Sequence, residues 1–282
     1  MRLLTFLFLA AIGLCPVRAQ AQSAAPTPAR AQAYTLFRPV PRDSLRELRP
    51  DRPGFSESPF TVDAGHFQLE SDLFRLLNHR EPGHRERDFF FNHALLKLGL
   101  SQRTDLGVEV DSYSWEKEWT DQQPPERRRG FGDLTLRLKH TLIGEEGKPA
   151  ALGIIGTLRL PVGHTVGTSA AEYGLIVPFA YDFSKKLNTQ LQLRSDLLAE
   201  PDGRHFLMLT PSTAIDYEFS PFLSTFAELA GQWDVRQAAW QASLNLGPQL
   251  HFGDNLILDC GTHLALTKEA SQEYFLGFSF RI

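Results

Sequence analysis

The chain has 282 residues, of which 42% are hydrophobic and 22% charged, so it is neither a polar disordered chain nor a bundle of apolar membrane helices. Lys and Arg number 29 against 33 Asp and Glu, and the net charge of -4 gives no electrostatic reason to bind nucleic acid. The 21 Phe against only two Met and two Cys favour a mostly β protein, because aromatic side chains suit pleated surfaces.

The first 21 residues have the organisation of a secretory signal peptide. Arg2 supplies the basic start, an apolar stretch follows from Leu3, and Ala19-Gln20-Ala21 is a small-x-small cleavage site. The apolar stretch is too short to span a bilayer. Cleavage also removes Cys15, so the exported chain is predicted to fold without an internal disulfide.

Residues 22–60 are rich in Pro, Ala and Arg, a composition that predicts an extended arm. Two interpretations of its block DRPGFSESP stay open at this point. The block folds into the inner mouth of the following domain as a partial plug, with Arg52 and Glu57 meeting charges there, or the arm hangs free in the periplasm.

Residues 61–282 form the main domain, and their apolar residues recur at every second position, which is the period of a β-strand. In the clearest segment, Trp240, Ala242 and Leu244 alternate with Gln241, Ser243 and Asn245. The predicted strands are twelve in number and cover residues 65–78, 88–101, 105–117, 131–143, 150–162, 173–184, 187–199, 205–219, 222–234, 239–252, 255–267 and 273–282.

The connections between these strands alternate in length. Those after the second, fourth, sixth, eighth and tenth strands are compact, whereas residues 78–88, 118–130, 164–172 and 199–205 are longer polar loops. Short turns at one end, long loops at the other and an even strand number are typical of an outer-membrane barrel. A soluble β-sandwich has no reason to sort its loops in this way, so the sequence predicts a transmembrane antiparallel β-barrel of about 12 strands.

Aromatic residues gather at the two ends of the predicted strands, where the headgroup levels of a bilayer would lie. The predicted girdle residues near the long loops are Trp115, Trp119, Trp233, Trp240, Tyr173 and Tyr274, and those near the short turns are Tyr181, Tyr217, Phe252 and Phe280.

Charged residues of both signs fall on the polar side of the strands, which the barrel turns inward. The predicted lumen-facing residues are Glu70, Asp72, Lys97, Glu109, Asp111, Arg137, Lys139, Arg159, Arg194, Asp196, Asp216, Glu218 and Glu228. They line a polar lumen that binds or filters solutes, or they fill the lumen with mutual ion pairs. We favour the second interpretation for most of them, since twelve strands enclose little free width, and a partly plugged barrel is expected.

Three prolines oppose the strand assignment, because each removes a donor from the ladder. Pro178, Pro211 and Pro248 lie inside predicted strands, and we expect bulges or local water there.

The stretch DRPGFSESPFTVDAGHFQLES (residues 51–71) resembles the opening of the phenol-degradation meta-pathway family of outer-membrane transporters. The blocks FGDLTLRLKHTL (131–142), LRLPVG (158–163) and EYFLGFSFRI (273–282) are similar to later parts of that family. The resemblance runs from about residue 50 to the end. It implies a barrel in the outer membrane of a Gram-negative bacterium that passes small molecules, and it brings no catalytic residues.

The last predicted strand alternates Tyr274, Leu276, Phe278, Phe280 and Ile282, the pattern that the outer-membrane assembly machinery reads. It departs from the usual pattern once, since Ile282 stands where Phe is usual. The expected partners are therefore outer-membrane lipid, the assembly machinery and a small solute of unknown identity.

Enzyme motifs are not evident, although some small outer-membrane barrels are lipid hydrolases. GFSES (54–58) falls one residue short of a G-x-S-x-G elbow, and the nine His show no zinc-binding spacing, so no catalytic residue, metal or cofactor is predicted. The predicted function is passive or facilitated passage of small solutes, with aromatic or apolar molecules among the candidates. A non-conducting structural or surface-binding barrel is the alternative, and a lipid hydrolase is the third.

Overall fold

A computed structural model describes residues 34–81, 83–121, 123–144, 148–268 and 270–282, which leaves the predicted signal peptide outside the described residues. No helix in this part of the chain is long and apolar enough to cross a membrane. The described elements are the 3-10 helix η1 (Arg42–Ser44) and the strands β1 (Phe67–Glu81), β2 (His84–Ser101), β3 (Thr104–Thr120), β4 (Gln123–Gly130), β5 (Leu134–Ile143), β6 (Ala150–Leu160), β7 (Glu172–Asp182), β8 (Leu187–Ala199), β9 (His205–Ser220), β10 (Leu223–Asp234), β11 (Ala239–Phe252), β12 (Leu256–Ala265) and β13 (Gln272–Arg281).

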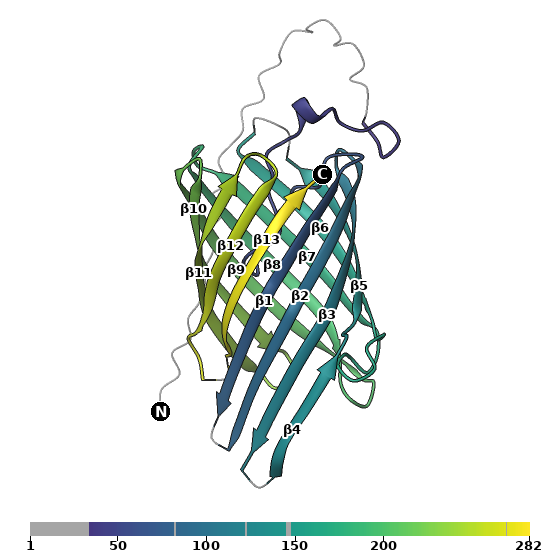
Figure 1. Ribbon diagram of the computed structural model, residues 1–282, viewed down its shortest axis with the longest axis vertical. Helices are drawn as coiled ribbons and strands as arrows, with labels where there is room; N and C mark the ends of the chain where they lie inside the picture. Colours follow the sequence, from purple (N-terminus) through teal and green to yellow (C-terminus); the bar gives the residue numbers. More distant parts are fainter. Residues whose placement is uncertain (1–33, 82, 122, 145–147, 269) are drawn as a thin grey trace, which may run out of the picture. The chain divides into compact units, whose positions relative to one another are not determined.

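The strands close into an antiparallel barrel (Figure 1). Each strand pairs with its neighbours in the chain, except that β3 pairs with both β4 and β5, and β1 seals the barrel by pairing with β13 from Gln68↔Arg281 to Asn78↔Gln272. Without β4, which pairs only along the end of β3, twelve strands form the closed wall. Closure pairs the backbone without leaving an edge, which a chain in hydrocarbon requires. The predicted twelve-stranded antiparallel barrel is confirmed.

The wall is apolar outside and polar inside, the reverse of a soluble protein. Leu138, Leu191 and Leu229 are about half exposed on the outer surface, whereas Glu70, Lys139 and Glu228 are almost fully buried inside the barrel. A charge on the outer face would cost about 2 to 4 kcal/mol near the bilayer midplane. The chain is therefore a transmembrane barrel of the outer-membrane type.

The two ends of the barrel differ. The short-turn end carries the connections β2–β3, β5–β6, β7–β8, β9–β10 and β11–β12 together with η1 and the C-terminus (Figure 1). At the opposite end, the hairpin end, β1 to β4 extend beyond the other strands (Figure 1).

The prediction of loops at residues 78–88 and 118–130 was wrong. Residues 78–81 and 84–88 continue β1 and β2 in register as far as Glu81↔His84, and residues 123–130 form β4 against β3. The polar side chains give no strand pattern here, because strand pairing uses backbone groups and needs no apolar residues outside the hydrocarbon of the bilayer.

The inward and outward alternation shifts by one residue at a single level across β1, β2 and β3. Asp111 faces the lumen, yet Ser114 is also buried inside while Tyr113 and Trp115 are exposed. Asn92 and Ser112 are not paired in the ladder between β2 and β3 at this level, and Asn92 adopts a φ of 54°. This shift decides which faces of the extended strands point outward at the hairpin end.

The expected bulges at Pro178, Pro211 and Pro248 are not observed, because no register shift occurs at any of them. Each proline keeps a continuous ladder with one neighbouring strand and interrupts the ladder with the other, which then resumes in the same register. The missing donor therefore costs a local break in one ladder, not an extra residue in the strand.

Candidate functional site

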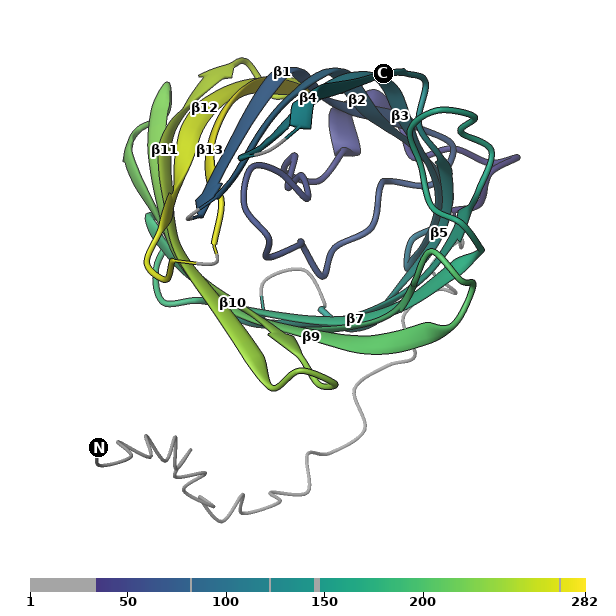
Figure 2. The same cartoon turned by 90° about the horizontal axis from the view of Figure 1, so that it is seen from below.

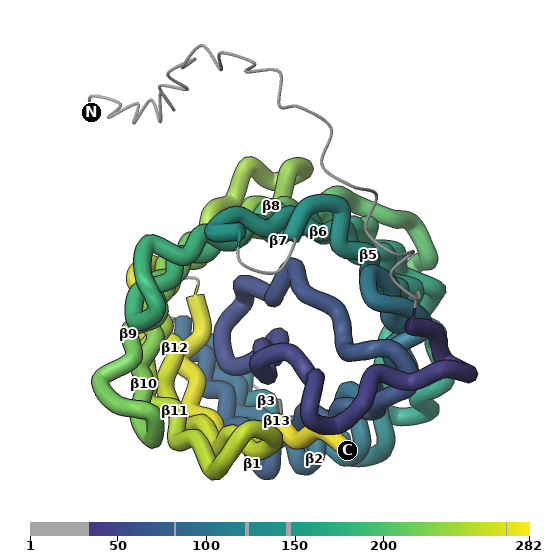
Figure 3. Tube along the Cα trace, turned by 90° about the horizontal axis from the view of Figure 1, so that it is seen from above, coloured from purple at the N-terminus to yellow at the C-terminus, as the bar shows by residue number. Residues whose placement is uncertain are grey.

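Residues 50–64, which we name the inner segment, lie inside the barrel (Figures 2 and 3). Pro50, Pro53 and Pro59 prevent this segment from pairing as a regular strand, and its polar groups bond instead to side chains of the wall. The partners belong to β1, β2, β3, β5, β8, β9, β10 and β12, so the segment is anchored around most of the circumference.

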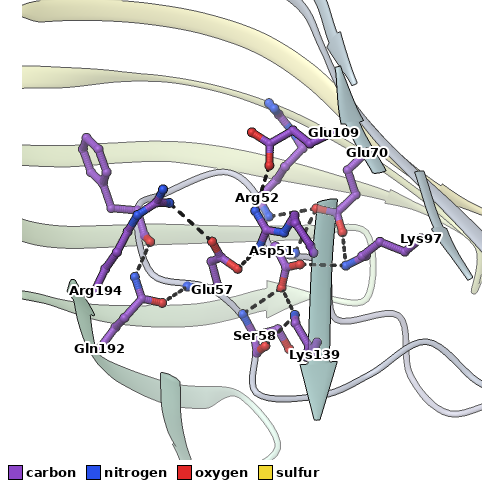
Figure 4. Close-up of polar contacts among 12 residues, drawn as sticks. Asp51, Arg52, Glu57, Ser58, Glu70, Lys97, Glu109, Lys139, Gln192 and Arg194 are labelled. Atoms are coloured by element: carbon purple, nitrogen blue, oxygen red, sulfur yellow. Dashed lines mark hydrogen bonds and ion pairs between the residues drawn. The ribbon is translucent and has the colours of Figure 1, made fainter. Parts of the chain in front are cut away.

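Asp51 is the centre of a buried ion-pair network (Figure 4). Its carboxylate accepts hydrogen bonds from Lys97 Nζ at 2.9 Å and from Lys139 Nζ, and from the backbone N–H of Ser58 at 3.1 Å. The backbone N–H of Asp51 donates to Glu70 Oε2 at 2.9 Å, and Glu70 also pairs with Lys97. Both ammonium groups and both carboxylates are thus satisfied by the contact of β1, β2 and β5 with the inner segment.

Arg52 binds acidic residues on the other side of β1 from Lys97 and Lys139, toward β13 and β12. Its guanidinium bonds to both carboxylate oxygens of Asp259 on β12, at 2.6 and 3.1 Å, and to Asp72 on β1. A bidentate arginine–carboxylate pair fixes orientation as well as charge. The inner segment is therefore held across the seam near β13.

The middle of the segment is held by a second set of polar side chains. Glu57 pairs with Arg137 of β5, and its carboxylate lies 3.9 Å from Arg194 of β8. Gln192 accepts a hydrogen bond from the Glu57 N–H at 2.8 Å and donates to the Phe55 carbonyl at 2.7 Å (Figure 4). This amide clamp holds the backbone of the segment against β8.

Glu228 on β10 closes the circle. Its carboxylate accepts the N–H groups of Phe55 at 2.8 Å and Ser56 at 2.6 Å, and it also accepts from Asn245 Nδ2 at 2.7 Å. The hydroxyls of Ser56 and Ser212 are 2.7 Å apart. Glu228 therefore acts as an acceptor for a turn of the inner segment that has no strand partner.

A second group of charges lies further toward the hairpin end. Arg159 bonds to Asp133 and Asp111 at 3.0 Å each. Arg194, which also lies 3.9 Å from Glu57 of the inner segment, joins this group through its bond to Asp196 at 2.7 Å. The side chains of Arg159 and Arg194 keep 35% and 36% of their surface exposed although they point into the barrel. The lumen beyond the inner segment thus presents charges with room for water or solute around them.

At the short-turn end, a cavity of about 1070 Å³ opens to the outside and is lined in part by Asp216, Glu218 and Arg49. Arg49 bonds to Asp182 at 3.1 and 3.3 Å. Burial opposes the charge of Arg49, but Glu47 and Asp182 outweigh it and raise the pKa of Arg49 above its ordinary value. The opening at the short-turn end therefore carries the permanent positive charge of Arg49 beside the carboxylates of Glu47 and Asp182.

The structure places the predicted lumen residues in three groups. The residues touching the inner segment are Glu70, Asp72, Lys97, Arg137, Lys139, Arg194 and Glu228. The residues beyond it, toward the hairpin end, are Glu109, Asp111, Arg159 and Asp196. The residues at the opening of the short-turn end are Asp216 and Glu218.

The sequence reasoning missed several residues of this site. Asp133 and Asp259 lie at polar positions of their predicted strands, so the same alternation rule could have identified them. Asp51, Gln192 and Ser212 carry no local signal, because only the folded arm brings them together.

The predicted girdle residues are mostly exposed at the ends of the strands. Trp115, Trp233, Trp240, Tyr173 and Tyr274 are exposed toward the hairpin end. Tyr181, Tyr217 and Phe252 form edge-on pairs with Phe183, Phe219 and Phe222 near the short turns, and Phe280 is exposed there. Trp119 differs from the others, because it lies four residues beyond Trp115 and its ring contacts the cations of Arg85 and Lys117.

The serines of the GFSES block have no catalytic setting. Ser56 Oγ contacts Ser212, and Ser58 Oγ accepts from the N–H of Phe60 at 3.3 Å, so neither bonds to a histidine. Across the described residues, no cluster of three or more His, Cys, Asp and Glu is arranged to hold a metal ion.

Several solved structures are similar to this chain. An outer membrane channel from Pseudomonas putida F1 is 14% identical, with a TM-score of 0.61 over 82% of this chain and 99% of that chain. The translocator domain of the autotransporter NalP from Neisseria meningitidis is 12% identical over 77% of this chain and 88% of that chain, with a TM-score of 0.49. The CymD monoaromatic hydrocarbon channel is 10% identical over 77% and 87%, with a TM-score of 0.43.

A search of curated proteins found no match to this chain. The family model described as "Putative MetA-pathway of phenol degradation" matches residues 50–282, which include the inner segment and every strand of the barrel. The resemblance inferred from the sequence blocks is thereby confirmed. The chain belongs to this MetA-pathway family of phenol degradation.

Proposed function

We propose that the protein provides a passive path for small solutes across the outer membrane, with the inner segment as its constriction. The observation that carries this proposal is the contrast between two parts of one lumen. Charges around Asp51 and Lys139 are buried by their mutual contacts, whereas the side chain of Arg159, beyond them, keeps 35% of its surface exposed. A lumen packed solid with ion pairs would bury both sets alike.

The family supports the same proposal, since its description refers to phenol degradation. The solutes we propose are therefore small molecules, aromatic compounds among them. Aromatic rings also lie inside the barrel, where the ring centroids of Phe55 and Phe275 are 5.1 and 5.2 Å from that of His263.

A reversible lock on the inner segment tests the proposal. Ser56→Cys and Ser212→Cys, in a Cys260→Ser background, replace two hydroxyls that are 2.7 Å apart and should form a disulfide on oxidation. Conductance in planar bilayers and swelling of liposomes in small solutes are measured before and after reduction. Passage in both states means a fixed constriction with an open path, and passage only after reduction means a segment that must move.

The matched control is Ser56→Cys alone in the same background, which cannot lock the segment. No passage by the wild type, the reduced pair or the control would contradict the proposal. That result would favour the alternative, a non-conducting structural barrel, which the ion pairs that hold the inner segment also support.

We also propose that the protein is not an enzyme. Ser56 and Ser58 are buried inside the barrel and lack a histidine partner, which supports this view. Release of fatty acid from phospholipid by the purified protein, lost on a serine or histidine substitution at the hairpin end, would contradict it.

The assembly machinery is the proposed partner of β13. The side chains of Tyr274, Leu276, Phe280 and Ile282 are exposed along one face of this strand. A slower assembly into membranes after Tyr274→Ser and Phe280→Ser, compared with the same changes at Tyr217 and Phe219 of β9, would support this recognition.

A further inference from the structure

The extended strands at the hairpin end separate their charges by face. From the level of Trp115 onward, the outward positions of β1 to β4 carry Arg80, Arg85, Arg87, Lys117, Arg127 and Arg129. We name this set the basic face. The acidic residues in the same part of these strands all fall on the opposite face, namely Glu81, Glu86, Asp88, Glu116, Glu118 and Glu126.

Like charges on the basic face are direct neighbours. The register places Arg87 opposite Lys117 and Lys117 opposite Arg127, so three cations lie side by side in one row across β2, β3 and β4. Like charges directly opposite each other destabilise a sheet. A bound anion would remove this repulsion.

Among the described residues, no carboxylate pairs with the cations of this row. On the opposite face, Arg128 pairs with Glu116 at 3.3 Å and His84 approaches Glu118 at 3.5 Å. Within the described residues, none of the six cations of the basic face forms an ion pair with a carboxylate. Arg87 donates instead to the neutral Asn78 at 2.9 Å, and Arg85 and Lys117 lie over the ring of Trp119.

The position of the basic face relative to the bilayer indicates which kind of anion binds there. Trp115 is 46% exposed, stacks on Phe89 and belongs to the aromatic belt that marks the headgroup level. Lys117 is two residues further along β3, or about 7 Å along the strand. Its ammonium group therefore stands where the phosphates of the outer leaflet lie, and it points toward lipid and not into the lumen.

We propose that the basic face binds the phosphate groups of the glycolipid in the outer leaflet. The one-residue shift at Asn92 and Ser112 turns these cations outward, and the ring of Trp119 positions two of them, Arg85 and Lys117, by cation–π contact. The bound lipid would neutralise the row at Arg87, Lys117 and Arg127 and hold the long hairpins upright beside the barrel.

The experiment uses purified full-length protein in phosphatidylcholine nanodiscs. Bis-phosphorylated lipid A and its dephosphorylated form are titrated, and bound lipid is counted by native mass spectrometry. The variant Arg87→Gln/Lys117→Gln/Arg127→Gln removes the row. The matched control, Arg128→Gln/Arg204→Gln/Lys268→Gln, removes three cations from the same end of the barrel but from other faces.

We expect the wild type and the control to prefer the phosphorylated lipid. The row variant should bind it on the order of 100-fold more weakly, because each cation near an anionic membrane surface contributes about a factor of five. If the triple variant does not fold, as judged by migration of the unboiled sample, Lys117→Gln alone should give about a fivefold loss.

Three results would overturn the proposal. Equal losses in the row variant and the control would show a general charge effect, and no preference in the wild type would show that the phosphate groups are not recognised. Displacement of lipid by inorganic phosphate at millimolar concentration would show a site for a free anion, since a membrane-level lipid site should resist it.

Discussion

Arg52 of the inner segment lies against the inner face of β13 at the one position of that strand that has no side chain, Gly277. The guanidinium occupies the space that a Cβ at Gly277 would need, and from there it reaches Asp72 and Asp259 on the flanking strands. The C-terminal strand thus carries a glycine that admits an arginine from the other end of the chain.

Gly277→Val is therefore expected to displace Arg52 and loosen the inner segment. Glu57, buried in the wild type, should then become a cleavage site for a glutamyl endoprotease, detected by mass spectrometry of the digest. Gly156→Val is the matched control, since a Cβ at this strand glycine meets open space. Protection of Glu57 in the Gly277 variant would contradict the contact.

Asp51→Asn should destabilise the protein strongly. The change leaves Lys139 with the carbonyl of Ser58 as its hydrogen-bond acceptor and removes one of two acidic partners from Lys97. Breaking a buried ion pair by removing one partner costs about 3 to 5 kcal/mol. The temperature at which unboiled protein loses its fast gel migration should fall.

Asp43→Asn provides the control for that change, because Asp43 is exposed on η1 and bonds only to the neighbouring Ser44. An unchanged transition temperature in the Asp51 variant would mean that the network around Lys97 and Lys139 contributes little.

Arg159→Gln should shift ion preference toward cations. The substitution leaves Asp111 and Asp133 without their shared cation in the exposed part of the lumen. We expect a twofold to fivefold rise, about what one unit charge supplies in a wet lumen, in the cation-to-anion permeability ratio from reversal potentials.

Lys139→Gln is the informative comparison, since Lys139 is 2% exposed and buried under the inner segment. It should lower stability and leave ion preference nearly unchanged. A larger change in ion preference for Lys139→Gln than for Arg159→Gln would mean that solutes pass beside Lys139 and not beside Arg159, which would contradict the proposed path.

The short-turn end is predicted to face the periplasm, as in bacterial barrels of this type. A single cysteine at Ser169, in a Cys260→Ser background, should react with an impermeant thiol reagent on intact cells. Both Ser169 and Asp254 are exposed, at opposite ends of the barrel, so Asp254→Cys should react only after the outer membrane is opened. The reverse pattern would mean that the barrel is inserted the other way up.

Strand period and loop spacing were enough to predict the barrel, because both are local properties of the chain. Alternation along Trp240 to Phe252 fixes which side of a strand meets lipid, and an apolar exterior around a polar interior follows from that. The same rule placed Glu70, Arg137 and Glu228 inside. It failed where polar strands continue above the membrane, at β4 and at the ends of β1 and β2, since backbone pairing there leaves no apolar signature.

The position of the inner segment was decided only by tertiary structure. The sequence named Arg52 and Glu57 as residues that meet lumen charges if the arm enters the barrel, but it left the free arm equally open. The choice depends on Asp51 finding Lys97 and Lys139, and on Gly277 making room for Arg52, contacts between residues 46 to 225 positions apart. No local pattern encodes such contacts, because they exist only once the strands have closed around the segment.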